Sequence, residues 1–386
     1  MDVFKIKSRG GVPGSSKGII WCIFAQFCAW ETTHSPPKLI IRDVGDKGII
    51  TLNRPKALNA LNMDMIRTIY PKLREWESNK ALVIIKGSGE KAFCAGGDVR
   101  SVTEAGKVGD PLTRDFFREE YILNCLIGTL VTPYVALIDG ITMGGGVGLS
   151  VHGQFRVATE RTLFAMPETA IGLFPDVGGG HFLPRLGGRL GLYLALTGYR
   201  LKGSDVLKAG VATHMCDSQH IGELTDTLLG LQNCYPEDVA ATLDKFHARA
   251  SFKDQPFSLK PVVKQIEECF KPTTVEGILD SLEKDGSEWA LKQVKLLRKM
   301  SPTSLKITLE QLERGNHLTL QDTLSMEYRL TQRCCSDHDF YEGVRAVLVD
   351  RDHSPKWNPA TVEEVDTEAV IKRYFAPLSA DQELIF

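Results

Sequence analysis

Apolar positions repeat with a regular period from residue 38 onward. Residues 38–55 alternate in the manner of a two-stranded hairpin, and Gly45 and Asp46 supply the turn between the strands. Residues 63–79 carry the period of an amphipathic helix, which Pro71 interrupts. Further short strands are predicted at 81–87, 133–140, 154–160 and 162–166. Strands that alternate with helices in this way predict an α/β arrangement.

The pattern changes after about residue 230, where strands become rare and the helical period continues. The predicted helical segments are 236–250, 275–300 and 302–315, with Asp or Thr near their starts and Gly or Pro near their ends. We therefore expect an α/β core at 38–230 that carries the active site. A C-terminal helical region should follow at 231–386.

The segment 1–37 differs in composition from the rest of the chain. It contains several basic residues but only two acids, Asp2 and Glu31, and it includes an apolar run at 18–30. A basic, acid-poor start predicts a leader that targets the mitochondrial matrix. The apolar run is shorter than a membrane span needs, and it is also compatible with a secretory signal or with an unstructured leader.

Charge and cysteine content narrow the function classes. The 386 residues carry a formal net charge of −2, which argues against a dedicated nucleic-acid binder because such proteins present a basic face. The nine cysteines are odd in number and none is spaced as C-x-x-C, so neither a disulfide framework nor a zinc site is expected. We expect mostly reduced thiols in an intracellular compartment.

Three glycine-rich stretches occupy 93–100, 140–153 and 176–181. The first two each follow a predicted strand and lead into a helix-like segment. Glycine lets a backbone N–H approach a ligand closely, and the N–H groups at a helix start are unpaired. One N–H from each loop, converging on one oxygen, would form an oxyanion hole. Close packing of helix against strand explains the same glycines equally well.

Three other glycine motifs do not match these loops. Val151 stands where a dinucleotide-binding fingerprint needs its last glycine, and His152 stands where the nucleophile elbow of a serine hydrolase needs one. Neither loop contains the Gly-Lys-Ser/Thr of a phosphate-binding Walker loop. We therefore expect His152 to be a packed or capping histidine.

Glu168 and Asp176 lie in an apolar stretch, each directly after a proline. A buried carboxylate without a partner is costly, so two of them in one apolar stretch point to chemistry. For Glu168 the structural alternative is a surface or salt-bridged acid. For Asp176 it is a turn that the side chain caps.

The chain resembles the crotonase (enoyl-CoA hydratase/isomerase) superfamily in four motifs that occur in the same order. These are "NRPKALNAL" (53–61), "FCAGGD" (93–98), "GITMGGG" (140–146) and "FAMPETAIGLFPDVGG" (164–179). The segments "FFREEY", "LTGYRLKG" and "EGVRAVLVDRDHSPKWNP" resemble the branch that hydrolyses 3-hydroxyisobutyryl-CoA in valine breakdown. The resemblance spans about 38–386 and implies a spiral of ββα units with the helical region after it.

One position departs from the hydratases of this superfamily. They carry a glutamate two residues after the last glycine of the triple, where this chain has Gly148. Attack at the thioester carbonyl is therefore expected, rather than addition of water across a C=C bond. An enoyl-CoA hydratase/isomerase and a non-catalytic crotonase-like subunit of a larger assembly remain the alternatives.

The resemblance implies a role for each site residue. The backbone N–H groups of Gly97 and Gly145 would hold the thioester oxygen. Glu168 would act as nucleophile or as general base on a water molecule. Asp176 would bind the 3-hydroxyl group and assist proton movement at the thiol. Glu120 matches a substrate-site acid, and its alternative is a solvated helix acid.

The resemblance also implies a coenzyme A site. Lys56, Ala57 and Leu58 would lie nearest the pantetheine and adenine, and Asp98 would cap its helix, approach the adenine, or do both. No metal or redox cofactor is implied, because coenzyme A is part of the substrate. The expected partner is an acyl-CoA, with no nucleic acid and no membrane, and a homo-oligomer is compatible with the family.

Overall fold

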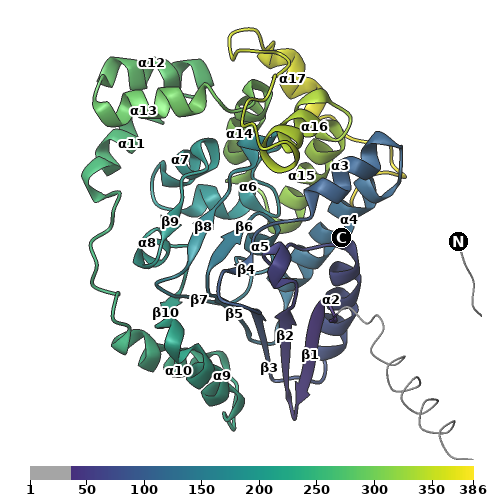
Figure 1. The fold of residues 1–386 in the computed structure, drawn as a ribbon, viewed down its shortest axis with the longest axis vertical. Coiled ribbons are helices and arrows are strands. Elements are labelled where there is room, and N and C mark those ends of the chain that lie inside the picture. The colour runs from purple at the N-terminus through teal and green to yellow at the C-terminus, as the bar shows by residue number, and fades with distance from the viewer. Residues whose placement is uncertain (1–35) are drawn as a thin grey trace, which may run out of the picture. The chain divides into compact units, whose positions relative to one another are not determined.

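Two β-sheets and the helices around them make up the fold (Figure 1). The computed structural model describes residues 36–386, and residues 38–386 form one compact unit. The basic residues and the apolar run of the predicted leader lie outside the described residues. Strands and helices alternate in the first half of this unit, so the α/β class predicted from the sequence is confirmed.

The larger sheet has the strand order β1-β2-β3-β5-β7-β10. Its strands are β1 (Leu39–Val44), β2 (Lys47–Leu52), β3 (Leu82–Gly87), β5 (Tyr134–Ile138), β7 (Phe155–Ala158) and β10 (His214–Met215). The first two form the predicted antiparallel hairpin, and the other neighbours are parallel. Parallel neighbours need crossover connections, and two of these crossovers carry the first two glycine loops.

The smaller sheet has the strand order β4-β6-β8-β9. Its strands are β4 (Ala92–Cys94), β6 (Ile141–Met143), β8 (Leu163–Ala165) and β9 (Leu201–Lys202). Each of β4, β6 and β8 follows a strand of the larger sheet by a few residues and leads into a helical segment. The chain therefore repeats a unit of two strands and a helix, which is the ββα unit expected from the sequence.

The larger sheet is covered on both faces. Leu82 and Ile84 of β3 pack with α9 (Ile221–Leu229) and α10 (Pro236–Arg249), whereas Val83 and Ile85 join the main core on the opposite side. Successive side chains of a strand point to opposite faces, so a strand buried on both reads as a continuous apolar run.

Helix α2 (Met63–Trp76) continues through Pro71, where the sequence predicted an interruption. The proline lies on the exposed side of the helix, whereas Ile66, Ile69 and Leu73 on the other side are buried. Water can reach the carbonyl group that the missing N–H of proline leaves unbonded. Packing of the buried face is therefore enough to hold the helix together.

Helices dominate the second half of the chain, as predicted. In the part of the chain that also contains the strands, the further helices are α3 (Val99–Lys107), α4 (Leu112–Thr129), α5 (Gly145–Gly148), α6 (Gly179–Phe182), α7 (Leu190–Thr197) and α8 (Ser204–Lys208). The C-terminal helices are α11 (Val263–Cys269), α12 (Val275–Asp285), α13 (Glu288–Leu297), α14 (Pro302–Gly315), α15 (Leu320–Cys334), α16 (His338–Val344) and α17 (Thr367–Tyr374). The domain boundary that we place at residue 230 stays a prediction.

The segment 275–300, predicted as helical, is divided into α12 and α13. Gly286 ends α12 with a φ of +66°, a backbone conformation that favours glycine. Ser287 then begins α13, because its side chain accepts a hydrogen bond from the backbone N of Ala290.

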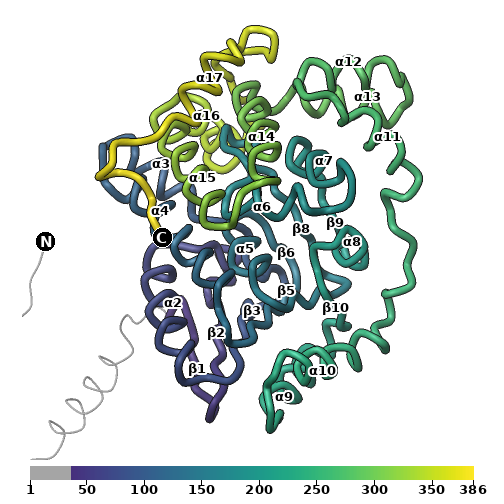
Figure 2. The backbone as a smooth tube through the Cα atoms, turned by 180° about the vertical axis from the view of Figure 1, so that it is seen from behind, coloured from purple at the N-terminus to yellow at the C-terminus, as the bar shows by residue number. Residues whose placement is uncertain are grey.

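The C-terminal helices return to the first half of the chain. An extended segment leads from α10 to α11, and α14 to α16 then lie beside α3, α4 and α6 (Figures 1 and 2). This return places α15 against α4 and α14 against α6, at the end of the fold where the glycine loops meet. A search of residues 36–386 finds no helix with the length and apolar character to cross a bilayer.

Candidate active site

The two glycine loops approach each other within contact distance. Gly97 precedes α3, and Gly145 is the first residue of α5. A Cβ atom placed on Gly145 would stand 3.2 Å from the backbone N of Gly97. The sequence pattern indicated that the loops follow β3 and β5 directly. They leave instead from β4 and β6, whose parallel pairing brings them together.

The backbone hydrogen bonds of the neighbouring elements do not use the N–H groups of Gly97 and Gly145. Leu61 donates to the carbonyl oxygen of Gly96 at 2.8 Å, and Asp98 donates to that of Leu61 at 2.7 Å. This parallel bridge uses the N–H groups on either side of it and skips the N–H of Gly97. Gly145 opens α5, where the first N–H groups have no intrahelical acceptor. Two donors from separate loops are therefore close together.

Glu168 stands beside this pair of loops. It opens the 3-10 helix η2 (Glu168–Ile171), directly after Pro167. A Cβ atom on Gly144 would stand 3.0 Å from Oε1 of Glu168 and 3.5 Å from Cα of Gly96, so the carboxyl group lies beside the second loop where the first loop approaches it. Glu168 is 5 % exposed, and among the described residues its Oε2 has no hydrogen-bond partner. The alternative of a surface acid is wrong.

Asp176 lies in a strained turn. Its Oδ2 accepts a hydrogen bond of 2.9 Å from the hydroxyl of Tyr121 on α4, and it is buried. The next two residues, Val177 and Gly178, have φ values of +52° and +84°. A β-branched residue rarely adopts this left-handed conformation, so the turn persists because its surroundings hold it.

A buried acid of the C-terminal helices holds that turn. Glu327 of α15 accepts hydrogen bonds from the backbone N of Gly178 at 2.7 Å and of Gly180 at 2.8 Å. Gln311 of α14 donates to Oε1 of Glu327 at 2.8 Å and to the carbonyl oxygen just before Asp176 at 2.7 Å. Residues from the second half of the chain therefore fix the position of Asp176.

Glu120 belongs to α4 and faces α5. It is 2 % exposed, and its Oε1 has no hydrogen-bond partner in the described chain. A Cβ atom on Gly145 would stand 2.5 Å from that oxygen, so the absence of a side chain at Gly145 lets the two helices come this close. The alternative of a solvated helix acid is wrong for Glu120.

Three carboxyl groups share this buried space. Burial, followed by the charge of Asp176, raises the pKa of Glu168 and of Glu120 well above the usual value of a glutamate. Burial raises the pKa of Asp176 to about 7, against the hydrogen bond from Tyr121, which lowers it. Like charges in one buried space oppose one another, so ionisation of one group disfavours ionisation of the next. A carboxyl group with a raised pKa is suited to proton transfer.

Gly148, the last residue of α5, has no room for a side chain. A Cβ atom there would stand 2.7 Å from Nδ2 of Asn124 and 2.8 Å from Cβ of Val177. A glutamate at this position, as in the hydratases of the resemblance, would therefore require the neighbours to move.

The residues predicted to contact coenzyme A lie near the surface beside the first glycine loop. Lys56 and Ala57 belong to the short helix η1 (Pro55–Ala57) and are exposed, and Leu58 follows with a φ of +51°. Lys56 and Leu58 line a hollow of about 320 Å³ together with residues 88–92. Ala57 is not among the residues that line it.

Asp98 caps α3, so the capping role predicted for it is confirmed, whereas its approach to the adenine stays a prediction. It accepts a hydrogen bond of 3.1 Å from the hydroxyl of Ser101 and pairs with Arg54 at 3.1 Å. It also lines a hollow of about 170 Å³ with Phe116, whose ring lies 3.1 Å from the point where a Cβ of Gly97 would stand. Asp98 is therefore close to the candidate site as well as a cap.

His152 is a packed histidine, as expected. Its Nε2 lies 2.7 Å from the carbonyl oxygen of Val177, and burial lowers its pKa to about 4. A neutral ring thus helps to hold the turn after Asp176. The seven cysteines within residues 36–386 are free thiols, and no group of three His, Cys, Asp or Glu side chains in this range is arranged to hold a metal ion.

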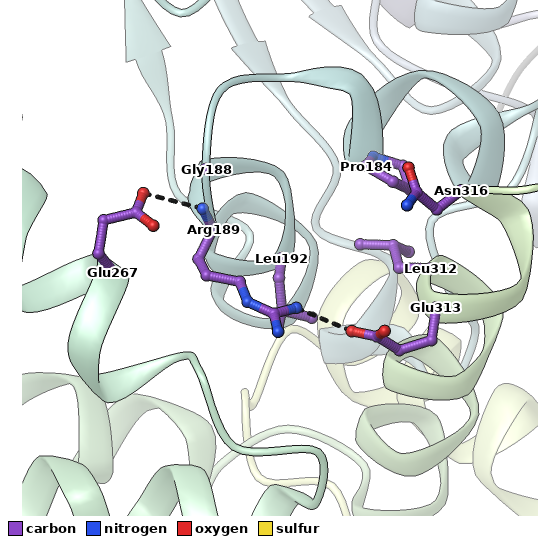
Figure 3. A pocket seen from close by; sticks show the side chains of 8 residues that line it. All are labelled: Pro184, Gly188, Arg189, Leu192, Glu267, Leu312, Glu313 and Asn316. Atoms are coloured by element: carbon purple, nitrogen blue, oxygen red, sulfur yellow. Dashed lines mark hydrogen bonds and ion pairs between the residues drawn. The ribbon is translucent and has the colours of Figure 1, made fainter.

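A hollow of about 260 Å³ at the start of α7 is separate from these groups (Figure 3). There the backbone N of Arg189 donates to Glu267 at 2.9 Å, and its guanidinium donates to Glu313 at 2.8 Å. The charged groups of this hollow bond to one another, and no predicted site residue lines it.

Sequence reasoning missed four residues of the site: Tyr121, Asn124, Gln311 and Glu327. Tyr121 follows Glu120 directly, and Asn124 lies one helical turn after Glu120, so the helical period of α4 was a usable signal. Glu327 lies three residues from both Leu324 and Leu330 on the buried side of α15. An acid on an apolar helix face was therefore visible, but its partners were not.

Comparison with known proteins agrees with this geometry. The enoyl-CoA hydratase/isomerase family pattern matches residues 47–375. Proteins named "3-hydroxyisobutyryl-CoA hydrolase, mitochondrial" are 60 % identical over 344 residues in Xenopus laevis (88 % of this chain, 89 % of that protein) and 56 % identical over 377 residues in Homo sapiens (94 % and 97 %).

Two solved structures share the fold over nearly the whole length. A carnitinyl-CoA dehydratase from Mycobacterium thermoresistibile is 38 % identical with a TM-score of 0.82, covering 90 % of this chain and 98 % of the other. An enoyl-CoA hydratase from Rhodobacter sphaeroides 2.4.1 is 37 % identical with a TM-score of 0.81, covering 91 % and 100 %. The crotonase-type fold is thereby confirmed. The chain belongs to the enoyl-CoA hydratase/isomerase family and, within it, to the 3-hydroxyisobutyryl-CoA hydrolases.

Proposed function

We propose that this chain hydrolyses the thioester of 3-hydroxyisobutyryl-CoA in the mitochondrial matrix, as a step of valine breakdown. Water and the thioester give 3-hydroxyisobutyrate and free coenzyme A. The observation that supports this most directly is the position of the Glu168 carboxyl group beside Gly144, where the second glycine loop approaches the first. A carboxyl group and two backbone donors at one point are what attack on a carbonyl carbon requires.

The backbone N–H groups of Gly97 and Gly145 stabilise the oxygen of the thioester in this mechanism. That oxygen gains negative charge as the tetrahedral intermediate forms. Donors that are already in place cost no reorganisation during the reaction, and each contributes about 3 kcal/mol to the transition state.

Glu168 acts on the carbonyl carbon in one of two ways. As a nucleophile it forms a mixed anhydride with the acyl group and expels the thiolate, and water then cleaves the anhydride. As a general base it takes a proton from a water molecule that attacks the carbon. Both routes need the carboxylate, and its proximity to both loops supports either.

Asp176 binds the 3-hydroxyl group and supplies a proton to the departing thiolate. Burial raises the pKa of this carboxyl to about 7, so it retains a proton at the pH where the leaving group needs one. Glu120, which directly precedes the Tyr121 that bonds to Asp176, contributes to the substrate site. Its Oε1 stands beside Gly145.

In this proposal coenzyme A lies along the first glycine loop. It passes Lys56 and Leu58 at the hollow that they line, and Asp98 at the separate hollow that Asp98 lines with Phe116. Ala57 is adjacent in the chain. The reaction as written needs no metal or redox cofactor. A homo-oligomer is compatible with the family, and the proposed reaction does not depend on it.

The test is release of free thiol from 3-hydroxyisobutyryl-CoA by the purified chain, measured with a thiol reagent. Glu168→Ala should abolish thiol release while the circular dichroism spectrum stays that of the wild type. Full turnover by this variant would overturn the assignment. Hydration of crotonyl-CoA without thiol release would favour an enoyl-CoA hydratase, and inertness towards every acyl-CoA would favour a non-catalytic subunit.

A trapping experiment distinguishes the two roles of Glu168. Hydroxylamine added during turnover attacks the anhydride at the carboxyl carbon of Glu168, and mass spectrometry then finds a hydroxamate on the Glu168 peptide. A general base leaves the enzyme unmodified under the same conditions.

A further inference from the structure

Asn124 is a buried side chain whose amide makes no bond. It is 0 % exposed, and within the described chain neither its Oδ1 nor its Nδ2 has a hydrogen-bond partner. The amide offers two N–H donors and one acceptor oxygen. Buried polar groups are bonded in the great majority of protein structures, so an amide with every position unused indicates a ligand that is absent from the free protein.

This amide lies among the groups of the candidate site. Asn124 is one helical turn after Glu120 on α4, so the two side chains share a face of that helix. Its Nδ2 is 2.7 Å from the point where a Cβ of Gly148 would stand, and Cβ of Val177 is 2.8 Å from the same point. Val177 directly follows Asp176. The amide therefore lies between the second glycine loop and the turn that carries Asp176.

The other side chains assigned to the site are mostly carboxyl groups. Oε1 of Glu120 and Oε2 of Glu168 are buried without partners in the described chain, and Asp176 already receives the hydroxyl of Tyr121. A hydroxyl group bound there finds acceptor oxygens for its hydrogen, whereas the lone pairs on its oxygen need a donor. The amide of Asn124 carries no charge and remains a donor whatever the protonation of the carboxyl groups.

We propose that Asn124 recognises the 3-hydroxyl group of the acyl chain together with Asp176. This inference rests on the proposed function, because it names the specificity-determining partner within the same site. Nδ2 of Asn124 donates to the hydroxyl oxygen, and the hydroxyl hydrogen is donated to an oxygen of the Asp176 carboxyl group. An acyl chain that lacks the hydroxyl leaves the buried amide unpaired, so the site disfavours it.

The same contact accounts for glycine at position 148. The amide of Asn124 reaches into the space where a side chain at 148 would begin. A site that reads a hydroxyl through Asn124 therefore excludes a side chain on Gly148. The glutamate of the hydratases and the amide of Asn124 compete for one volume.

The test compares two substrates that differ only in the hydroxyl group: 3-hydroxyisobutyryl-CoA and isobutyryl-CoA. Asn124→Leu keeps nearly the same shape and removes both polar atoms. We expect its kcat/KM for the hydroxylated substrate to fall by roughly tenfold or more, because a hydrogen bond to the substrate is lost. The kcat/KM for isobutyryl-CoA should stay the same or rise, so the ratio between the substrates collapses.

Thr308→Val is the matched control. Thr308 is also 0 % exposed, and its side-chain oxygen has no partner within the described chain, but it lies on α14 and not on α4. Its replacement should leave the ratio between the two substrates at the wild-type value. Asn124→Ser, a smaller polar variant, provides a second measurement if Asn124→Leu does not fold, and it should show the same collapse of the ratio.

An equal loss for both substrates would assign Asn124 to the hydrolytic water or to packing, and it would overturn the proposal. An unchanged ratio with unchanged rates would overturn it as well. These results require a wild-type enzyme that releases thiol from 3-hydroxyisobutyryl-CoA. A wild type that fails to do so refutes the proposed function, and with it this inference, so the two failures are distinguishable.

Discussion

The hydroxyl of Tyr121 lies 2.9 Å from Oδ2 of Asp176 and donates a hydrogen bond to it inside the protein. Burial raises the pKa of Asp176 to about 7, and this bond acts in the opposite direction by stabilising the ionised form. Tyr121 thus connects α4, which also carries Glu120, to the strained turn. The protonation state of Asp176 near neutral pH depends on both helix and turn.

Tyr121→Phe should therefore raise the pKa of Asp176 further. The limb of the pH–rate profile that reports this group should move to higher pH, and kcat/KM should fall by about tenfold because one hydrogen bond to the acid is lost. The measurement is kcat/KM for 3-hydroxyisobutyryl-CoA between about pH 5 and 9. Tyr341→Phe removes a tyrosine hydrogen bond of 2.8 Å whose acceptor is the backbone carbonyl of Cys335 and not a carboxyl group, and it should not move the limb.

Gly145→Ala should disable the oxyanion hole. The new Cβ atom would stand 2.5 Å from Oε1 of Glu120 and 3.2 Å from the backbone N of Gly97, so both groups would have to shift. We expect kcat to fall by about 100-fold with little change in KM, because the donors act mainly in the transition state. Gly222→Ala is the control, since nothing lies within 4 Å of its Cβ position. A Gly145→Ala enzyme with wild-type kcat would contradict the role of this loop.

Glu327→Ala should release the turn that holds Asp176. It leaves the backbone N–H groups of Gly178 and Gly180 buried without acceptors, which lowers the free energy of unfolding by about 2–5 kcal/mol. Because the strained turn then relaxes, kcat should fall more than the loss of stability alone explains. Denaturant unfolding and kcat at a temperature where the variant remains folded are the measurements.

Glu276→Gln is the control that separates a loss of stability from a direct loss of kcat in Glu327→Ala. Glu276 pairs at 2.6 Å with the buried Lys306, between α12 and α14, and so its loss also destabilises the fold. This variant should lose stability and keep kcat. Equal losses of kcat in both variants would mean that Glu327 acts through general stability only.

Local signals account for most of what the sequence predicted correctly. Gly45 and Asp46 form a turn by their own chemistry, and the apolar alternation on either side needs no distant partner to specify a hairpin. Glu168 stood out because an acid in apolar, proline-bounded sequence needs a reason to be there. Its position beside the place where the two loops approach each other, however, depends on the pairing of β4 with β6, and those strands have only three residues each.

Long-range contacts account for what the sequence could not predict. Glu327 lies about 150 residues after the turn that it holds, and no local pattern specifies its partners Gly178 and Gly180. Pro71 was expected to break a helix on propensity, but its carbonyl neighbour is exposed and the buried face of α2 outweighs that propensity. Tertiary packing decided both cases.

Asp176→Asn should stabilise the free enzyme at high pH. The pKa of Asp176 is about 7 in the folded chain, against a usual value of 3.8. Between these values the folded state binds a proton that the unfolded state does not, so the free energy of unfolding falls as pH rises through this window. The variant has no carboxyl group at position 176, so its free energy of unfolding does not fall in this way. Its melting temperature should exceed that of the wild type by about 2 °C or more at pH 8, and the difference should vanish towards pH 4. A difference that is the same at every pH would contradict the assignment of this pKa.

Gly148→Glu should not convert this enzyme into a hydratase, although it restores the glutamate that the hydratases of the family resemblance carry. The first atom of the new side chain would stand 2.7 Å from Nδ2 of Asn124 and 2.8 Å from Cβ of Val177. Overpacking of this kind costs about 1–3 kcal/mol, and the polar atoms that it displaces are buried. We expect a lower melting temperature, loss of thiol release and no hydration of crotonyl-CoA.

The double variant Gly148→Glu with Asn124→Ala tests the cause of that loss. If the amide of Asn124 blocks the glutamate, removal of the amide should recover part of the stability, and the two changes should be non-additive by about 1 kcal/mol or more. Val177 remains in place in this variant, so recovery should be incomplete. Thermal unfolding of the wild type, both single variants and the double variant measures the coupling. Strictly additive changes would place the obstruction at Val177 instead, because only that residue would then oppose the new side chain.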